Sequence, residues 1–426
     1  MLRQMSFRGI LALGLLVAAM GAERVAYYTA RVFLTLELAR SEGLATAAIG
    51  KVVAATSFGT VIAMFVGAGL AFAIGPRLTA LVGALVAMLG SLLLLLGAPF
   101  LLGWALASAG AGLFRVCPFV VAAELLGSDD ARIDAPGQAL PPARFLRMTA
   151  FAAVAYVAIN VSAGLAVPVA KMSYERGGLA LASGAAAAAA FVAALFSGGA
   201  ALSAQRNRPD RRLGPPAADP YRAPAAPLSQ RPGAPASMKP LAGAMLLACL
   251  FAAFHVGEAL GLPHLPELAH VNLTLLYTMS HATSIVLCLI AAGVFLVLAL
   301  LESARGPLPV FGAALALCGL GFFVRTLAGE QLASHVAAAG LTSFGDVAAP
   351  IGTAYAALAV RGRASGFVLA GWFTVATVAS MIGSPLGQTP LRTPLLVLVA
   401  LVCLAAGVAV TALGRTLHRT WFDPAP

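Results

Sequence analysis

Long apolar segments alternate with short stretches that contain Arg, Pro and Gly along most of the chain. An α-helix rises about 1.5 Å per residue, so about 20 apolar residues cross a hydrocarbon core of about 30 Å. Each apolar segment is long enough for one crossing. The segments cover residues 9–38, 45–74, 78–98, 100–126, 148–171, 178–203, 241–261, 272–302, 307–328, 332–360, 366–387 and 392–414. The pattern predicts an all-α polytopic membrane protein with twelve transmembrane helices in two six-helix bundles.

The two sets of six segments are separated by a stretch rich in Pro and Arg, at residues 204–239. Such a composition can neither span a membrane nor pack as a core, and Pro keeps the chain extended. This stretch is therefore predicted to be a linker. The expected domains are an N-terminal bundle at 1–203, the linker at 204–239, a C-terminal bundle at 240–414 and a tail at 415–426.

The composition supports a membrane protein and argues against soluble classes. Hydrophobic residues make up 60% of the chain and charged residues only 10%, against about 25% charged residues in soluble domains. The five cysteines are scattered through apolar segments, so neither a disulfide framework nor a metal cluster is indicated. The sequence contains no nucleotide-binding loop or catalytic triad, and we expect neither an enzyme nor a cofactor.

The positive charge predicts the orientation in the membrane. Lys and Arg collect on the cytoplasmic side of short loops, and placing the N-terminus inside puts most of the 27 Lys and Arg residues there. We therefore expect a multi-pass protein of the inner membrane. Both of its termini and the linker are expected on the cytoplasmic side. This asymmetry accounts for the net charge of +11 without nucleic acid, and the linker is a candidate contact with anionic lipid.

The first segment carries an unusual group of charged and phenolic residues. Helical spacing places Arg24, Tyr27 or Tyr28, and Arg31 on one stripe, with Glu23 as the nearest counter-charge. Arg binds a carboxylate through two parallel hydrogen bonds, so the stripe predicts a site for an anionic group in one cavity. A purely structural network that ties this helix to its neighbours is the alternative interpretation.

Three motifs in the first half resemble those of the proton-coupled oligopeptide transporters, a family with the major facilitator fold. Residues 23–31 resemble its first-span signature, Glu-x-x-Glu-Arg-Phe-x-Tyr-Tyr-Gly-x-Arg. Residues 110–115, Gly-Ala-Gly-Leu-Phe-Arg, are similar to Gly-x-Gly-Leu-Phe-Lys, with Arg115 at the Lys. Residues 156–164, which include Asn160, resemble Phe-Tyr-x-x-Ile-Asn-x-Gly.

The second half carries shorter matches to the same family. Asp346 before Pro350 resembles the acid of the family's tenth span, although it lies four residues before the Pro instead of five. Trp372 and Phe373 are placed as the family's Trp-Phe in the eleventh span. The resemblance therefore extends thinly over both halves.

The resemblance implies a carrier that moves short peptides inward with protons. It implies that Arg31, Tyr27 and Tyr28 hold the substrate carboxylate with the help of Arg115. Asn160 would contact the amine or the backbone of the substrate, and Asp346 would pair with the substrate amine from the other bundle. The candidates for proton coupling are Glu23, His255 and Glu258.

Departures from the family leave alternatives open. Met20 replaces the first Glu of the signature, and Phe72 stands where the superfamily has an Asp in the loop after the second span. Proton coupling can therefore differ from that of the family. The alternatives are a general major facilitator exporter or organic-anion carrier, and a membrane sensor or scaffold that does not transport.

Overall fold

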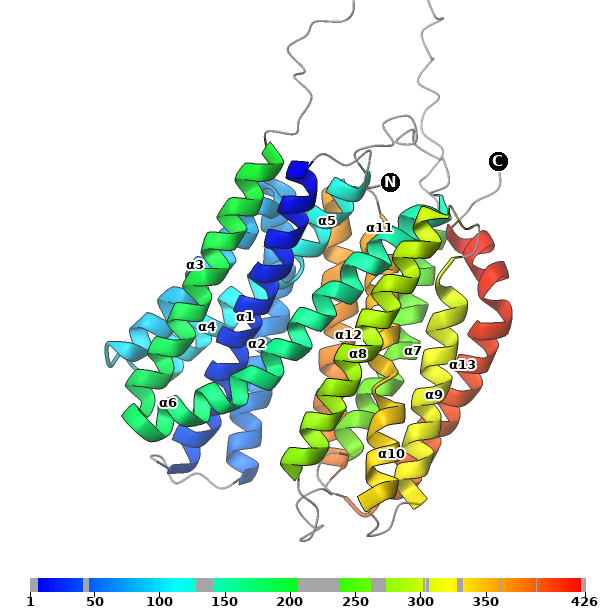
Figure 1. Cartoon of the computed structure of the whole chain (residues 1–426). Coiled ribbons are helices and arrows are strands. Elements are labelled where there is room, and N and C mark those ends of the chain that lie inside the picture. The colour runs from blue at the N-terminus through cyan, green and yellow to red at the C-terminus, as the bar shows by residue number, and fades with distance from the viewer. Residues whose placement is uncertain are drawn as a thin grey trace, which may run out of the picture.

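The computed structural model describes residues 7–40, 46–127, 141–205, 238–261, 273–301, 303, 306–327, 332–360, 362–387 and 389–422. Within this part of the chain the regular elements are all helical (Figure 1). The first-half helices are α1 (Phe7–Arg40), α2 (Thr46–Ile74), α3 (Pro76–Leu95), α4 (Phe100–Arg115), α5 (Cys117–Gly127) and α6 (Pro142–Gln205). The second half contains α7 (Lys239–Gly261), α8 (Leu273–Leu300), α9 (Leu308–Leu327), α10 (Leu332–Thr342), α11 (Gly345–Leu358), the short 3-10 helix η2 (Gly362–Ala364), α12 (Ser365–Leu386) and α13 (Arg392–Phe422).

The described residues contain ten helical segments that are long and apolar enough to cross a membrane. The all-α polytopic class predicted from the apolar pattern is therefore confirmed. The longest of the ten segments belongs to α6, whose backbone leaves the helical conformation at Gly177 and Gly178. Gly178 has φ of +60°, a left-handed conformation that favours glycine, and the chain reverses direction there (Figure 1).

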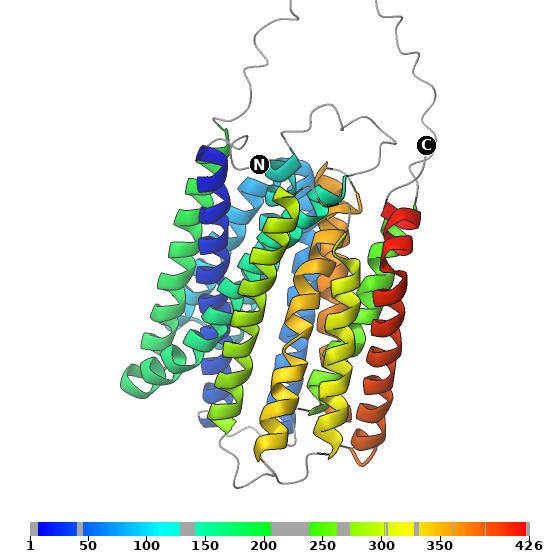
Figure 2. The ribbon, with the colours of Figure 1, turned by 45° about the vertical axis from the view of Figure 1, so that its right-hand side comes forward.

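The helices before and after the central linker gather on opposite sides of the molecule (Figures 1 and 2). On the first side α1 packs against α6 and α3 against α4, while on the second side α7 packs against α12 and α9 against α13. The two sides touch mainly through α6 with α8 and α11, and through α2 with α12. The start of α1 and the end of α13 lie at the same end of the molecule, here called the terminal end (Figure 1).

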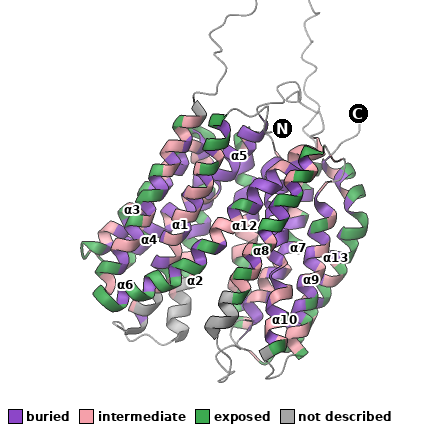
Figure 3. Ribbon diagram, in the orientation of Figure 1, coloured by how far each residue is buried: buried purple, intermediate pink, exposed green. Residues whose placement is uncertain are grey.

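The exposure of the side chains follows this arrangement. The outer surface is apolar, and the most deeply buried helices lie between the two sides. Large hydrophobic side chains are exposed along the outer faces of most helices, as in a protein surrounded by lipid (Figure 3). Every residue of α11 is buried except Asp346, which is partly buried, and α5 is buried except for Glu124. These two short helices are therefore enclosed by helices from both sides of the molecule.

Aromatic side chains from both sides meet at the terminal end. The ring of Phe145 in α6 lies 4.7 Å from that of Tyr355 in α11 and 5.1 Å from that of His418 in α13, between ring centroids. Tyr355 and His418 are also joined by a 2.7 Å hydrogen bond between Oη and Nδ1. Both sides are thus in direct contact at this end.

Candidate functional site

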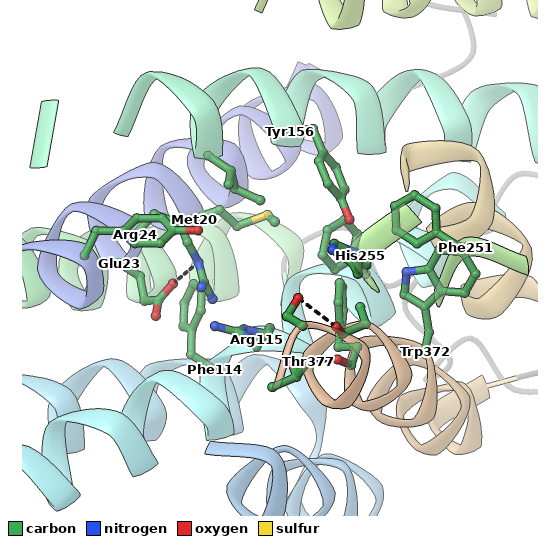
Figure 4. Close-up of a pocket in the computed structure, with 16 residues that line it drawn as sticks. Met20, Glu23, Arg24, Phe114, Arg115, Tyr156, Phe251, His255, Trp372 and Thr377 are labelled. Atoms are coloured by element: carbon green, nitrogen blue, oxygen red, sulfur yellow. Dashed lines mark hydrogen bonds and ion pairs between the residues drawn. The ribbon is translucent and has the colours of Figure 1, made fainter. Parts of the chain in front are cut away.

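A cavity of about 210 Å³ lies between the two sides of the molecule (Figure 4). Helices α1, α4, α5 and α6 supply one wall, and α7 and α12 supply the other. The lining residues are Met20, Glu23, Arg24, Tyr28, Phe114, Arg115, Phe119, Tyr156, Ile159, Phe251, His255, Trp372, Phe373, Ala376, Thr377 and Ser380. The cavity is below the range of about 300–1,000 Å³ that is usual for drug-sized ligands, so it suits a small solute.

Glu23 and Arg24 form a buried ion pair on the α1 side of this cavity. Their side chains are 1% and 7% exposed, and Arg24 Nε lies 2.8 Å from Glu23 Oε2. Apart from this ion pair, neither carboxylate oxygen of Glu23 has a hydrogen-bond partner among the described residues. Glu23 is therefore neutralised by charge but remains able to accept hydrogen bonds.

The ring of Tyr27 contacts two guanidinium groups at once. The Cζ atoms of Arg24 and Arg115 lie 5.3 and 5.4 Å from its centroid, within the range of cation–π attraction. Tyr28 packs edge-on to Tyr27, with centroids 5.5 Å apart. Tyr27 thus brings two cations close together beside the cavity, and among the described residues Glu23 is the one carboxylate on the same wall.

The opposite wall is aromatic. Phe251 in α7 stacks on Trp372 in α12, with centroids 5.2 Å apart and planes 6° from parallel. His255 packs edge-on to Phe251 at 4.8 Å and faces the same cavity. His255 Nδ1 is 3.9 Å from Glu258 Oε2, although Glu258 does not line the cavity. This wall offers apolar faces and one imidazole to a ligand.

Several residues singled out in the sequence lie away from the cavity wall. Arg31 is exposed, because the seven residues from Arg24 to Arg31 extend about 10 Å along the helix. Of the predicted stripe, Arg24 and Tyr28 line the cavity, whereas Arg31 does not. Tyr27 lines a smaller neighbouring pocket instead.

Asn160 and Asp346 are engaged with other side chains. Asn160 Nδ2 donates to the Tyr156 carbonyl at 3.0 Å, and Asn160 Oδ1 lies 3.2 Å from His281 Nδ1. Asp346 accepts a short hydrogen bond from the Ser284 hydroxyl. The Asn160–His281 contact joins α6 to α8 across the two sides, whereas the Ser284–Asp346 bond joins α8 to α11 within the second side, and neither Asn160 nor Asp346 lines the cavity.

The family resemblance singled out Trp372 and Phe373 in α12, but not Thr377 and Ser380, which also line the cavity. Phe373, Thr377 and Ser380 line it at helical spacing. The hydroxyls of Thr377 and Ser380 donate to carbonyls one turn earlier in α12, so their oxygens still accept hydrogen bonds. For Thr377 and Ser380 the sequence signal was their helical spacing as small polar residues in an apolar helix, which does not indicate the neighbouring helix.

Comparison with known proteins identifies the fold. No protein-family model matches the sequence, and no curated protein matches it. Among solved structures, an auto-inhibited POT family peptide transporter is similar at 14% identity, with a TM-score of 0.57 over 95% of this chain and 96% of that one. The POT family transporter PepTSo is similar at 14% identity, with a TM-score of 0.59 over 96% of this chain and 98% of that one. The predicted resemblance is thus confirmed in the fold: over nearly its whole length, this chain folds as the POT family peptide transporters do.

Proposed function

We propose that this protein is a secondary transporter that moves a small carboxylate-bearing solute across the inner membrane by alternating access. The observation that carries the proposal is the cavity between the two sides, which joins two guanidinium groups to an aromatic wall. In carriers of this architecture the substrate site lies between two halves that rock against each other. A cavity with walls from both sides is what that motion requires.

The charges of the cavity favour an anionic group on the ligand. Arg24 and Arg115 supply two cations against the single carboxylate of Glu23. A guanidinium matches the planar, bidentate geometry of a carboxylate better than an ammonium does. We therefore assign the carboxylate contact to Arg24, Arg115 and Tyr28, with Tyr27 holding the two guanidiniums in place.

A short peptide or an amino-acid-like compound is the substrate that we favour. The likeness in fold to peptide transporters supports this class, as does the small volume of the cavity. The stacked rings of Phe251 and Trp372 suit an apolar substrate side chain. Arg31, Asn160 and Asp346 lie outside the wall, so we assign them no direct substrate contact in this conformation.

The proposed topology has twelve crossings. It counts α6 as two spans divided at Gly177 and Gly178, and it counts α4 with α5 and α10 with α11 as one broken span each. The bundles are then residues 1–203 and 240–414, joined by the linker at 204–239. The linker, both termini and the tail at 415–426 are placed in the cytoplasm by the charge asymmetry.

Proton coupling is proposed to depend on His255 with Glu258. His255 lines the cavity and lies 3.9 Å from Glu258, and histidine is the side chain whose charge changes most readily near neutral pH. Uptake driven by an imposed pH gradient should be lost in Glu258→Gln while substrate counterflow persists. Gradient-driven uptake that survives Glu258→Gln but vanishes in Glu23→Gln would place the coupling in α1 instead.

Counterflow in proteoliposomes tests the transport proposal directly. Vesicles loaded with unlabelled dipeptide should accumulate labelled dipeptide with a free C-terminal carboxylate, and the C-terminally amidated form should compete poorly. An N-acetylated dipeptide tests the amine separately, and full competition by it would indicate an organic-anion carrier. Binding in a thermal-shift assay without any counterflow would favour a sensor over a transporter.

A further inference from the structure

A second, much smaller cavity lies behind Tyr27, between α1, α3 and α4. Its volume is about 10 Å³. Apart from five alanines, it is lined by Glu23, Tyr27, Ser91, Trp104 and Ser108. Glu23 lines both this pocket and the larger cavity, so this residue lies between the two.

Buried polar side chains whose hydrogen bonds are not all satisfied line this pocket. Trp104 and Ser108 are each 3% exposed and Glu23 is 1% exposed. Among the described residues, the Trp104 indole nitrogen, the Ser108 hydroxyl and both Glu23 carboxylate oxygens have no hydrogen-bond partner, apart from the ion pair of Glu23 Oε2 with Arg24. Buried polar groups are almost always satisfied by protein or by ordered water, and three such residues around one pocket point to a shared partner.

The size and chemistry of the pocket identify that partner. A water molecule needs about 10–15 Å³ of such space and two to four polar neighbours, and the pocket has room for one molecule only. Trp104 offers an N–H donor, the Glu23 carboxylate offers acceptors, and Ser108 can do either. A metal cation fits poorly, because an indole N–H is a donor and cannot act as a ligand.

We propose that this pocket binds one structural water that bridges Trp104 and Ser108 to the Glu23 carboxylate. Trp104 Nε1 donates to the water, and the water donates to Glu23 and exchanges a hydrogen bond with the Ser108 hydroxyl. Trp104 and Ser108 are then positioning residues, which orient Glu23 from the side opposite the larger cavity. This site does not depend on whether the protein transports a solute.

A double-mutant cycle tests the bridge. Ser108→Ala and Glu23→Gln should each lower the Tm, and the double variant should lower it by less than the sum, because either change disrupts the same water. The matched control is Ser183→Ala, since Ser183 in α6 is also buried, has no hydrogen-bond partner among the described residues and does not line the pocket. Ser183→Ala and Glu23→Gln should be additive. Additive Tm shifts for Ser108→Ala with Glu23→Gln would overturn the proposal.

A density map provides a test that needs no variant, in case Glu23→Gln does not fold. At a resolution that reveals other buried waters, a peak should lie about 2.7–3.2 Å from Trp104 Nε1, Ser108 Oγ and a Glu23 oxygen. Ser108→Ala should weaken or abolish the peak. Absence of density in the native pocket would overturn the proposal, and so would a peak with the short, multiple oxygen contacts of a metal ion.

Discussion

The guanidinium of Arg363 in η2 donates a hydrogen bond from Nη1 to the backbone carbonyl of Phe72, close to the end of α2, at 3.2 Å. A cation at the C-terminal end of a helix is favourable because the last carbonyls carry partial negative charge. Gly75, with φ of +99°, leaves room beside this guanidinium. Phe72 occupies the position where an acid was expected from the superfamily. Its carbonyl, and not its side chain, therefore joins the two sides at the terminal end.

We expect Arg363→Ala to loosen this end without unfolding the protein. Arg363 is exposed, so the stability change should be at most about 1 kcal/mol. Spin labels at Ile74 and Phe367, which are both exposed, should show a longer or broader distance distribution in the variant. Cys249, the exposed native cysteine of the described residues, is first replaced by Ser.

The matched control for this measurement is Arg415→Ala, because Arg415 is an exposed arginine of α13 near the same end. The distance distribution should be unchanged in this control. Identical distributions in the native protein and in Arg363→Ala would contradict a role for the hydrogen bond in holding the two sides together.

Phe145→Ala should have a larger effect at the same end. Phe145 is 1% exposed and packs against Tyr355, His418 and Phe422, so its removal leaves a cavity between the two sides. Phe→Ala in a core costs about 3–5 kcal/mol, and we expect a clear drop in Tm. Phe191→Ala serves as control, because Phe191 in α6 is 49% exposed. Equal Tm values for the two variants would contradict the packing described.

Arg115→Ala should weaken substrate binding strongly. Loss of a hydrogen bond to a charged group costs about 1.5–3 kcal/mol, or roughly a 10- to 150-fold increase in Kd, measured by calorimetry with the best dipeptide ligand. Arg115→Lys should recover little, since an ammonium lacks the planar fork of guanidinium. Arg31→Ala is the control, because Arg31 does not line the cavity. A larger increase in Kd for Arg31→Ala than for Arg115→Ala would indicate that the carboxylate site lies toward the end of α1.

Glu23→Gln should destabilise the fold. It leaves Arg24 buried without its counter-charge, and breaking a buried ion pair from one side costs about 3–5 kcal/mol. The same substitution at Glu175 is the control. Glu175 pairs with Lys171 at 3.9 Å, with side chains 49% and 67% exposed, and such surface pairs contribute about 0–1 kcal/mol. Unfolding in detergent measures both variants, and a native-like midpoint for Glu23→Gln would mean that Arg24 is solvated.

Labelling of single cysteines should establish the orientation. Met238 and Leu391 are both exposed, and they lie at opposite ends of the molecule, before α7 and before α13. In the Cys249→Ser background, Met238→Cys should react with an impermeant reagent only after permeabilisation, while Leu391→Cys should react in intact cells. The reverse pattern would place the terminal end outside the cell.

The sequence by itself determined the membrane class, the approximate position of each apolar helix and the Glu23–Arg24 neighbourhood. These features are local, since the length of an apolar segment against the bilayer and the spacing along one helix need no knowledge of other segments. The motifs around Arg115 and Trp372 also indicated the family whose fold the chain shares. Each of these signals lies within a single stretch of sequence.

Only the tertiary structure decided which of the candidate site residues lie around the same cavity. The cavity joins α1 and α4 to α7 and α12, so Arg115 faces it while Arg31, on the same helix as Arg24, does not. The rotation of a helix and the depth at which it crosses its neighbours depend on packing of small side chains over its whole length, which no single motif encodes. For the same reason, the convergence of Trp104 and Ser108 on Glu23 becomes visible only when α4 is packed against α1.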